Sequence, residues 1–117
     1  MAKNRQPEYE LQKAVVTYLT IKYPKVLYCA SAGGVRTSMS QARKMKATGY
    51  KKGFPDLFIY ECRGNWCGLA IELKVKGNYP NEHQKKWQED LGNRGYCARI
   101  CTGLDDAIET IKWYLRL

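Results

Sequence analysis

Two carboxylates and one amine occur at a spacing that two paired strands would bring together. Asp56 follows Pro55 at the start of one apolar stretch, and Glu72 and Lys74 stand at the end of the next. Neighbouring carboxylates repel each other unless a cation joins them, and Mg²⁺ prefers oxygen ligands of this kind. An amine beside the ion can orient or help to deprotonate a water and stabilise charge that develops on phosphorus. The pattern predicts metal-dependent hydrolysis of a phosphodiester.

A β-hairpin is the element that would position these side chains. Residues 56–62 and 66–74 are rich in aromatic and branched side chains, as strands are. Arg63-Gly64-Asn65, between them, suits a three-residue turn. The hairpin is therefore predicted to be antiparallel and tightly connected.

The register of this hairpin decides whether the site exists. If Cys62 pairs with Trp66, then Asp56 lies directly opposite Glu72, and opposed Cβ atoms are about 4.5–5.5 Å apart. Alternation along the strand puts Lys74 on the same face. A slip of one residue would move Asp56 to the other face. The simpler alternative is a solvated strand face carrying an ordinary Glu-x-Lys pair.

Positive charge is concentrated ahead of the hairpin. The net charge is +9, and residues 1–52 carry eleven Lys and Arg against two Glu, whereas residues 53–117 carry nine of each sign. Such asymmetry is typical of proteins that bind a polyanion. A membrane surface is the alternative partner, but the sequence shows no basic amphipathic helix with a wide apolar face, which is the feature that would favour it. DNA is the predicted partner, and RNA is not distinguished from it.

The expected phosphate contacts lie between the first predicted strand and the hairpin, in a segment without acidic residues. Contacts of this kind position nucleic acid without reading its sequence, and a solvated helix face is the alternative. A glycine pair in the preceding loop would let backbone amides approach a phosphate, although a plain turn fits equally well. The candidates are Ser31, Gly33, Gly34, Arg36, Arg43, Lys44, Lys46, Lys51 and Lys52.

Eight elements are predicted in the order helix, strand, helix, strand, strand, helix, strand, helix. The predicted helices cover residues 7–23, 36–50, 81–93 and 105 onward, and the strands cover 26–32, 56–62, 66–74 and 96–101. This order predicts an α/β fold with a mixed sheet flanked by helices. At 117 residues the chain is expected to form one domain, 1–117, with residues 1–6 as a loose basic arm.

The last helix carries more large apolar side chains than one face needs. Its predicted buried stripe consists of Leu104, Ile108, Ile111 and Leu115. That stripe leaves Trp113, Tyr114 and Leu117 at the flank and the C-terminal end. Because exposed aromatic patches often mark interfaces, we expect this end to contribute to a homodimer. Packing within one chain is the alternative.

Cysteine usage indicates a reducing compartment. There are five cysteines, and no signal peptide or long apolar run is apparent. The pairs Cys62-x₄-Cys67 and Cys97-x₃-Cys101 miss the usual Cys-x₂-Cys spacing of structural zinc sites. We therefore expect reduced thiols and a cytoplasmic location.

The residues of the predicted site resemble the motif of a known family. Gly53-x-Pro55-Asp56 followed by Glu72-x-Lys74 resembles the PD-(D/E)XK nuclease superfamily. The glycine, the Glu-x-x-x-Gln pair near the N-terminus and the length are similar to its VRR-NUC branch, from about Pro7 to the last helix. The resemblance implies a restriction-endonuclease-like fold and phosphodiester hydrolysis with Mg²⁺, or with Mn²⁺ in its place. It also implies the stand-alone phage or bacterial type, which dimerises and cuts branched DNA such as Holliday junctions.

The resemblance also implies roles for individual residues at the metal. Asp56 and Glu72, with the backbone carbonyl of Leu73, would hold one or two Mg²⁺ ions, and Lys74 would orient the attacking water. Two further functions stay open beside this one. A protein of the same fold that binds DNA without cutting it is the first, and a restriction-type or flap nuclease is the second.

Three positions outside the hairpin complete the predicted site. By the resemblance, a glutamate on the first helix reaches the metal; Glu8 fits best, Glu10 is the alternative, and a favourable helix N-terminus would explain either. Gln84, in the first turn of a later helix, matches a glutamine that the family places near the catalytic residues, although surface glutamines are ordinary. Tyr79 is positioned to stack on a displaced base, with packing against the sheet as the alternative.

Overall fold

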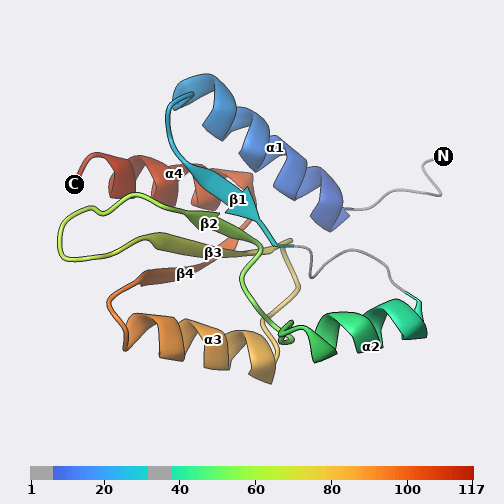
Figure 1. The fold of residues 1–117 in the computed structure, drawn as a ribbon. Helices are drawn as coiled ribbons and strands as arrows, with labels where there is room; N and C mark the ends of the chain where they lie inside the picture. The colour runs from blue at the N-terminus through green and yellow to red at the C-terminus, as the bar shows by residue number, and fades with distance from the viewer. Residues whose placement is uncertain (1–6, 32–37) are drawn as a thin grey trace, which may run out of the picture.

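The computed structural model describes residues 7–31 and 38–117 of the chain. Its elements follow the predicted order, which confirms the α/β class with a mixed sheet (Figure 1). They are α1 (Pro7–Lys22), β1 (Tyr28–Ala30), α2 (Met39–Ala47), β2 (Leu57–Ile59), β3 (Leu69–Lys74), α3 (Glu82–Gly92), β4 (Cys97–Thr102) and α4 (Leu104–Leu115). The first three strands are shorter than predicted. The predicted N-terminal arm, Gly33, Gly34 and Arg36 lie outside the described residues.

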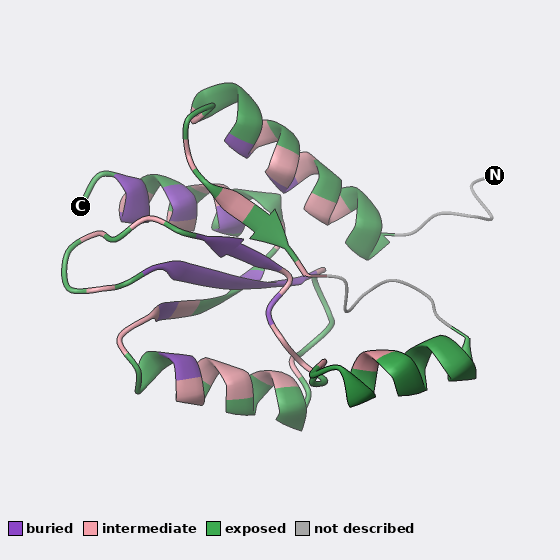
Figure 2. Ribbon diagram, viewed as in Figure 1, coloured by how far each residue is buried: buried purple, intermediate pink, exposed green. Residues whose placement is uncertain are grey.

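The four strands form one sheet in the order β1-β2-β3-β4. The β1–β2 and β2–β3 pairs are antiparallel, whereas β4 pairs with β3 in parallel. Helices α1 and α4 cover one face of this sheet and α3 covers the other (Figure 1). All six residues of β3 are buried, so the middle of the molecule is organised around this strand (Figure 2).

Alternation along the strands divides the core into two clusters. Odd-numbered residues of β2 and β3, such as Leu57 and Ile71, pack with Val15 and Leu19 of α1 and with α4. Even-numbered residues turn toward α3, where Phe58, Ala70 and Leu91 form the smaller cluster. Because side chains alternate with a period of two, Glu72 and Lys74 continue the row of Ala70 on the α3 side. The hydrophobic pattern therefore determines which face receives the polar residues.

The hairpin turn differs from the prediction, although the site register does not. Arg63 pairs with Trp66 through two backbone hydrogen bonds of 3.1 and 2.9 Å, so the turn has two residues, Gly64 and Asn65. Farther along, Ile59 pairs with Leu69. Between these two pairs lie three residues of the first strand, 60–62, and two of the second, 67 and 68. This extra residue offsets the shorter turn, as a β-bulge does.

The prediction for the buried stripe of α4 was wrong in part, because the helix is rotated relative to it. The buried residues are Ala107, Ile111, Tyr114 and Leu115, whereas Leu104 is 37% exposed. Tyr114 Oη donates to the carbonyl oxygen of Glu61 at 2.6 Å. The proposed C-terminal dimer surface therefore loses Tyr114, which is used within the chain.

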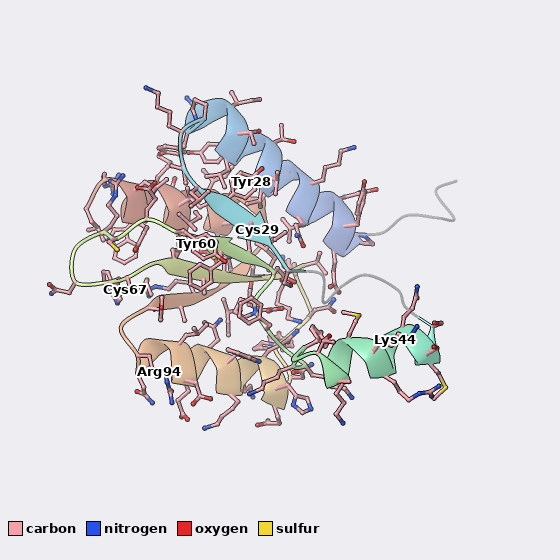
Figure 3. All side chains as sticks on the ribbon, viewed as in Figure 1. Tyr28, Cys29, Lys44, Tyr60, Cys67 and Arg94 are labelled. Atoms are coloured by element: carbon pink, nitrogen blue, oxygen red, sulfur yellow. The ribbon has the colours of Figure 1, made fainter. Side chains whose placement is uncertain are left out.

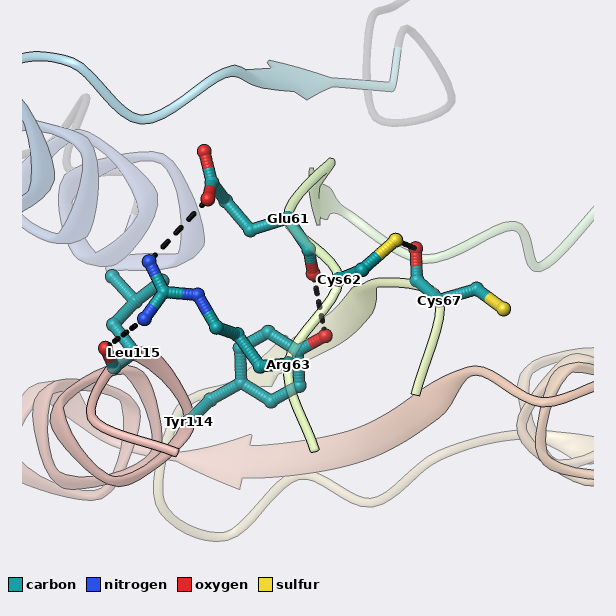
Figure 4. Close-up of polar contacts among 6 residues, drawn as sticks. All are labelled: Glu61, Cys62, Arg63, Cys67, Tyr114 and Leu115. Carbon is teal, nitrogen blue, oxygen red and sulfur yellow. Dashed lines mark hydrogen bonds and ion pairs between the residues drawn. The ribbon is translucent and has the colours of Figure 1, made fainter. Parts of the chain in front are cut away.

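The hairpin also docks on the C-terminal end of α4 (Figure 4). The guanidinium of Arg63 donates to the carbonyl oxygen of Leu115 and is paired with Glu61 at 3.4 Å. Trp66 packs edge-to-face on Trp113 with a centroid separation of 5.5 Å. The large aromatics of the last helix thus hold the tip of the β2–β3 hairpin in place.

Helix α2 is the exception to this packing. Ser38 caps it, with a capping box completed by Gln41. None of its residues is buried, and Figure 2 shows it as an exposed helix beside the N-terminal end of α3. The predicted 15-residue helix over 36–50 is observed as nine residues. Because no residue of α2 is buried, its capping box rather than core packing stabilises this helix.

Candidate active site

The structure brings the hairpin carboxylates together at the end of the β2–β3 ladder. Leu57 pairs with Ile71, which puts Asp56 at the position opposite Glu72, as predicted. The Asp56 carboxylate accepts a hydrogen bond of 2.7 Å from the backbone N–H of Leu73. Lys74 Nζ lies 3.7 Å from Glu72 Oε2. The two carboxylates and the amine therefore form one group.

Glu72 and Lys74 are buried and Asp56 is half-buried, and burial changes the protonation of the carboxylates. Glu72 is 3% exposed and Lys74 is 8% exposed. Burial first, and then the negative charge of Asp56, raises the pKa of Glu72 to about 8, against the opposing influence of Lys74. The pKa of Asp56 is also raised by burial, although the Leu73 N–H opposes that shift. In the absence of a cation, the pair therefore tends to retain a proton.

The donor set fits a hard divalent cation. A cation can replace the retained proton and remove the repulsion between Asp56 and Glu72. The residues described contain no cluster of three or more His, Cys, Asp or Glu side chains suited to hold a metal. Mg²⁺ needs only one or two carboxylates, because it keeps several waters and takes phosphate oxygens from the substrate. The role of the Leu73 carbonyl stays a prediction.

Glu8 approaches this group from the start of α1. Its negative charge contributes to raising the pKa of both Asp56 and Glu72. Glu8 Oε1 also accepts a hydrogen bond of 3.5 Å from Asn78 Nδ2, in the loop after β3. Of the two predicted glutamates, Glu8 is thus placed where its charge reaches the carboxylates.

Gln84 has a structural role that the sequence did not reveal. Its side-chain oxygen accepts from Asn81 N and its own N–H donates to Asn81 Oδ1, both at 2.9 Å. This capping box starts α3, with Asn81 as its cap. The sequence analysis did not name Gln88, one turn after Gln84. Its Nε2 is buried and has no hydrogen-bond partner among the described residues. The spacing of four residues, which puts Gln84 and Gln88 on one face of the helix, could have indicated it.

Gly53 packs the segment that leads into Asp56 against α3. Its φ is +83°, and an added Cβ would lie 2.6 Å from the backbone carbon of His83 and 2.8 Å from Gln84 N. Only glycine tolerates this combination of left-handed backbone and close approach. The glycine of Gly53-x-Pro55-Asp56 therefore packs the lead-in to Asp56 against the first turn of α3.

Replacing Gly53 by Ala is expected to lower the free energy of unfolding by more than about 2 kcal/mol, because backbone strain and a steric clash add. Gly49→Ala is the matched control: its φ is +110°, but no atom lies within 4 Å of the added Cβ. Urea denaturation of both variants measures the difference. Equal losses of stability would show that the contact with α3 contributes nothing.

The predicted phosphate contacts are mostly exposed and basic. Arg43, Lys44 and Lys46 lie on α2, the helix that stands apart from the sheet (Figure 3). The backbone N–H of Ser31 donates to the carbonyl oxygen of Asp56 at 3.0 Å, which places Ser31 beside the site. Tyr79 is 82% exposed, so it does not pack against the sheet.

No helix in the described ranges is both long and apolar enough to cross a membrane.

Comparison with known proteins is consistent with this geometry. The family model of the VRR-NUC domain matches residues 2–105. A solved structure titled "VRR_NUC domain protein" is 34% identical and superposes with a TM-score of 0.83, over 97% of this chain and 91% of that one. A second, titled "VRR_NUC domain", is 19% identical with a TM-score of 0.63, over 94% and 99%, and shares the fold. No curated protein matches the chain.

Proposed function

Because the chain belongs to the VRR-NUC domain family, a nuclease-type family, we propose that it is a Mg²⁺-dependent endodeoxyribonuclease. One observation carries the proposal. Glu72 is buried and Asp56 is half-buried; they are held together beside Lys74, and the pKa of each is raised. A fold selected only for stability gains nothing from two mutually repelling carboxylates that are largely withdrawn from water. A metal site explains them.

The chain's own residues have separable roles in this mechanism. Asp56 and Glu72 are the side-chain ligands, and Glu8 is a third carboxylate at the margin of the site. When bound, Mg²⁺ polarises the phosphate and lowers the pKa of a water. Lys74, held by Glu72, orients the attacking water and stabilises the charged transition state. The Leu73 N–H holds one oxygen of the Asp56 carboxylate, which leaves the other oxygen available as a ligand.

Branched DNA and a homodimer complete the proposal. A four-way junction has approximate two-fold symmetry, so a C₂ dimer presents one active site to each of two strands. Because Tyr114 is used within the chain, another surface is the better candidate. Leu27 and Tyr60 are 65% and 51% exposed, and the backbone N–H of Tyr60 donates to Leu27 O beside β1 at the sheet edge. Apolar side chains along an edge strand favour association between copies.

Cleavage of defined DNA structures tests the function. Labelled linear duplex, flap and four-way-junction DNA would be incubated with Mg²⁺, with Mn²⁺ or with EDTA. We expect cutting with either metal, none with EDTA, and paired symmetric cuts in the junction. Salt-sensitive binding without cutting under either metal would instead identify a DNA-binding protein that keeps the fold.

A further inference from the structure

A groove of about 950 Å³ is lined by residues of α2, of α3 and of the segment that leads into Asp56. Figure 1 shows α2 beside the N-terminal end of α3. Its size is at the upper end of the range for small-molecule pockets. Two kinds of side chain line it. Arg43, Lys46, Lys51 and Lys52 supply positive charge, while Met39, Met45, Tyr50 and Trp87 supply apolar and aromatic surface.

The positive charges of the groove are available to a ligand. Across the part of the chain that the structure describes, ion pairs involve none of the four basic residues just named. The acidic lining residue, Asp90, is instead paired with Lys86 at 3.1 Å. The groove is therefore complementary to an anion with several charges along its length.

The aromatic side chains narrow the choice of anion. Trp87 is fixed, because its indole Nε1 donates to Lys52 O at 3.0 Å and its ring meets Phe54 edge-on at 4.9 Å. Tyr50 lines the same groove and is half-buried. Phosphates alone need no apolar wall, whereas an unpaired base stacks on aromatic rings. The combination fits a single nucleic-acid strand better than the outside of a duplex.

The groove is connected to the catalytic group. A smaller hollow of about 350 Å³ shares Tyr50, Lys51 and Trp87 with it and extends to Ser31. The backbone N–H of Ser31 donates a hydrogen bond of 3.0 Å to the backbone carbonyl oxygen of Asp56. A strand that lies in the groove can therefore continue toward the carboxylates.

We propose that the groove between α2 and α3 binds a single-stranded DNA segment that continues from the scissile phosphate. One base stacks on Tyr50, and Arg43, Lys46, Lys51 and Lys52 contact the phosphates. The proposal rests on the proposed nuclease function and deepens it. The substrate is then DNA with an unpaired strand, such as a flap or the opened arm of a branch.

Binding to an oligonucleotide with and without bases tests this assignment. Fluorescence anisotropy in EDTA would compare labelled oligo-dT with an oligonucleotide of the same length containing abasic units. We expect the unmodified protein to prefer oligo-dT at least about fivefold, the effect of stacking one base. Tyr50→Ala removes this preference, while Tyr50→Phe, which keeps the ring, retains it. Equal affinity of the unmodified protein for the two oligonucleotides would overturn the assignment of Tyr50 as the residue that stacks on a base.

A double variant tests the phosphate contacts. Arg43→Ala with Lys46→Ala is expected to weaken binding of both oligonucleotides about tenfold and to flatten the salt dependence. Lys22→Ala with Lys112→Ala removes the same charge from α1 and α4, and is expected to weaken binding less than twofold. Equal losses in the two double variants would overturn the groove. The binding assays are run in EDTA and do not depend on cleavage. If the protein prefers oligo-dT in EDTA but does not cut DNA in Mg²⁺, the nuclease function is refuted and the groove assignment is not.

Discussion

Replacing Asp56 by Asn, Glu72 by Gln or Lys74 by Met is expected to reduce cleavage by at least about a thousandfold. The first two changes keep size and hydrogen bonding but remove the charge that a divalent cation requires. The third removes the amine that orients the water and stabilises the transition state. Initial rates of DNA cleavage in Mg²⁺ measure the loss.

The controls for these variants lie on the same chain. Glu109→Gln removes a carboxylate that is 70% exposed on α4, and Lys76→Met removes an exposed amine two residues beyond Lys74. Both are expected to cut DNA within about twofold of the unmodified protein. DNA affinity in EDTA is expected to change little in all five variants, because the basic surface is intact. Full activity in any of the three site variants would refute the assignment of that residue.

Glu72 is also expected to make the metal-free protein less stable as pH rises. Its pKa is about 8 in the folded protein and 4.5 ordinarily, so between these values the folded chain holds a proton that the unfolded chain has released. The associated stabilisation is fully present below about pH 4.5, decreases by up to about 1.4 kcal/mol per pH unit, and is lost above about pH 8. Mg²⁺ should restore stability at high pH, because it binds the ionised pair in the folded state.

Urea denaturation in EDTA at pH 5.5, 7.0 and 8.5 measures this slope. Glu72→Gln cannot ionise, so it is expected to flatten the slope and to be more stable than the unmodified protein at pH 8.5. It should also lose most of the stabilisation by Mg²⁺. Glu109→Gln, which alters an exposed carboxylate, should retain both the slope and the response to metal. A flat profile in the unmodified protein would show that Asp56 and Glu72 are already ionised without metal.

Opposite selection pressures explain why one substitution is expected to abolish function and increase stability. The buried Glu72 and the half-buried Asp56 destabilise the metal-free fold, because their desolvation and repulsion exceed the stabilisation by Lys74. The same arrangement supplies the carboxylate oxygens that the proposed divalent cation requires. The site therefore concentrates instability where the chemistry is proposed to occur.

Local patterns in the sequence were sufficient for most elements. Proline at the start of α1, Ser38 before α2 and Asn81 before α3 are chemical signals that act within one turn, so they predict helix starts without tertiary information. Strand limits were less accurate, because β1 and β2 are as long as their pairing partners permit. The actual ladder between them contains three residue pairs.

The register of the β2–β3 hairpin was predicted correctly from an incorrect turn. The two-residue turn at Gly64-Asn65 would by itself have shifted Asp56 by one position, and the extra residue between Ile59 and Arg63 returns it. The burial of Ile71 and Leu73 against α1 and α4 requires this register. The alternation of apolar residues therefore determines the register, and the loop adjusts to it.

The sequence by itself determined the class of fold, the face shared by Glu72 and Lys74, and the charge of the surface beside them. These follow from residue type and a period of two or 3.6, which need no partner. Only the tertiary structure decided that Gly53 packs against the first turn of α3, that Tyr114 anchors the hairpin to α4, and that α2 and α3 enclose a groove. Those outcomes depend on which segments, distant in sequence, come together, and local periodicity carries no information about that choice.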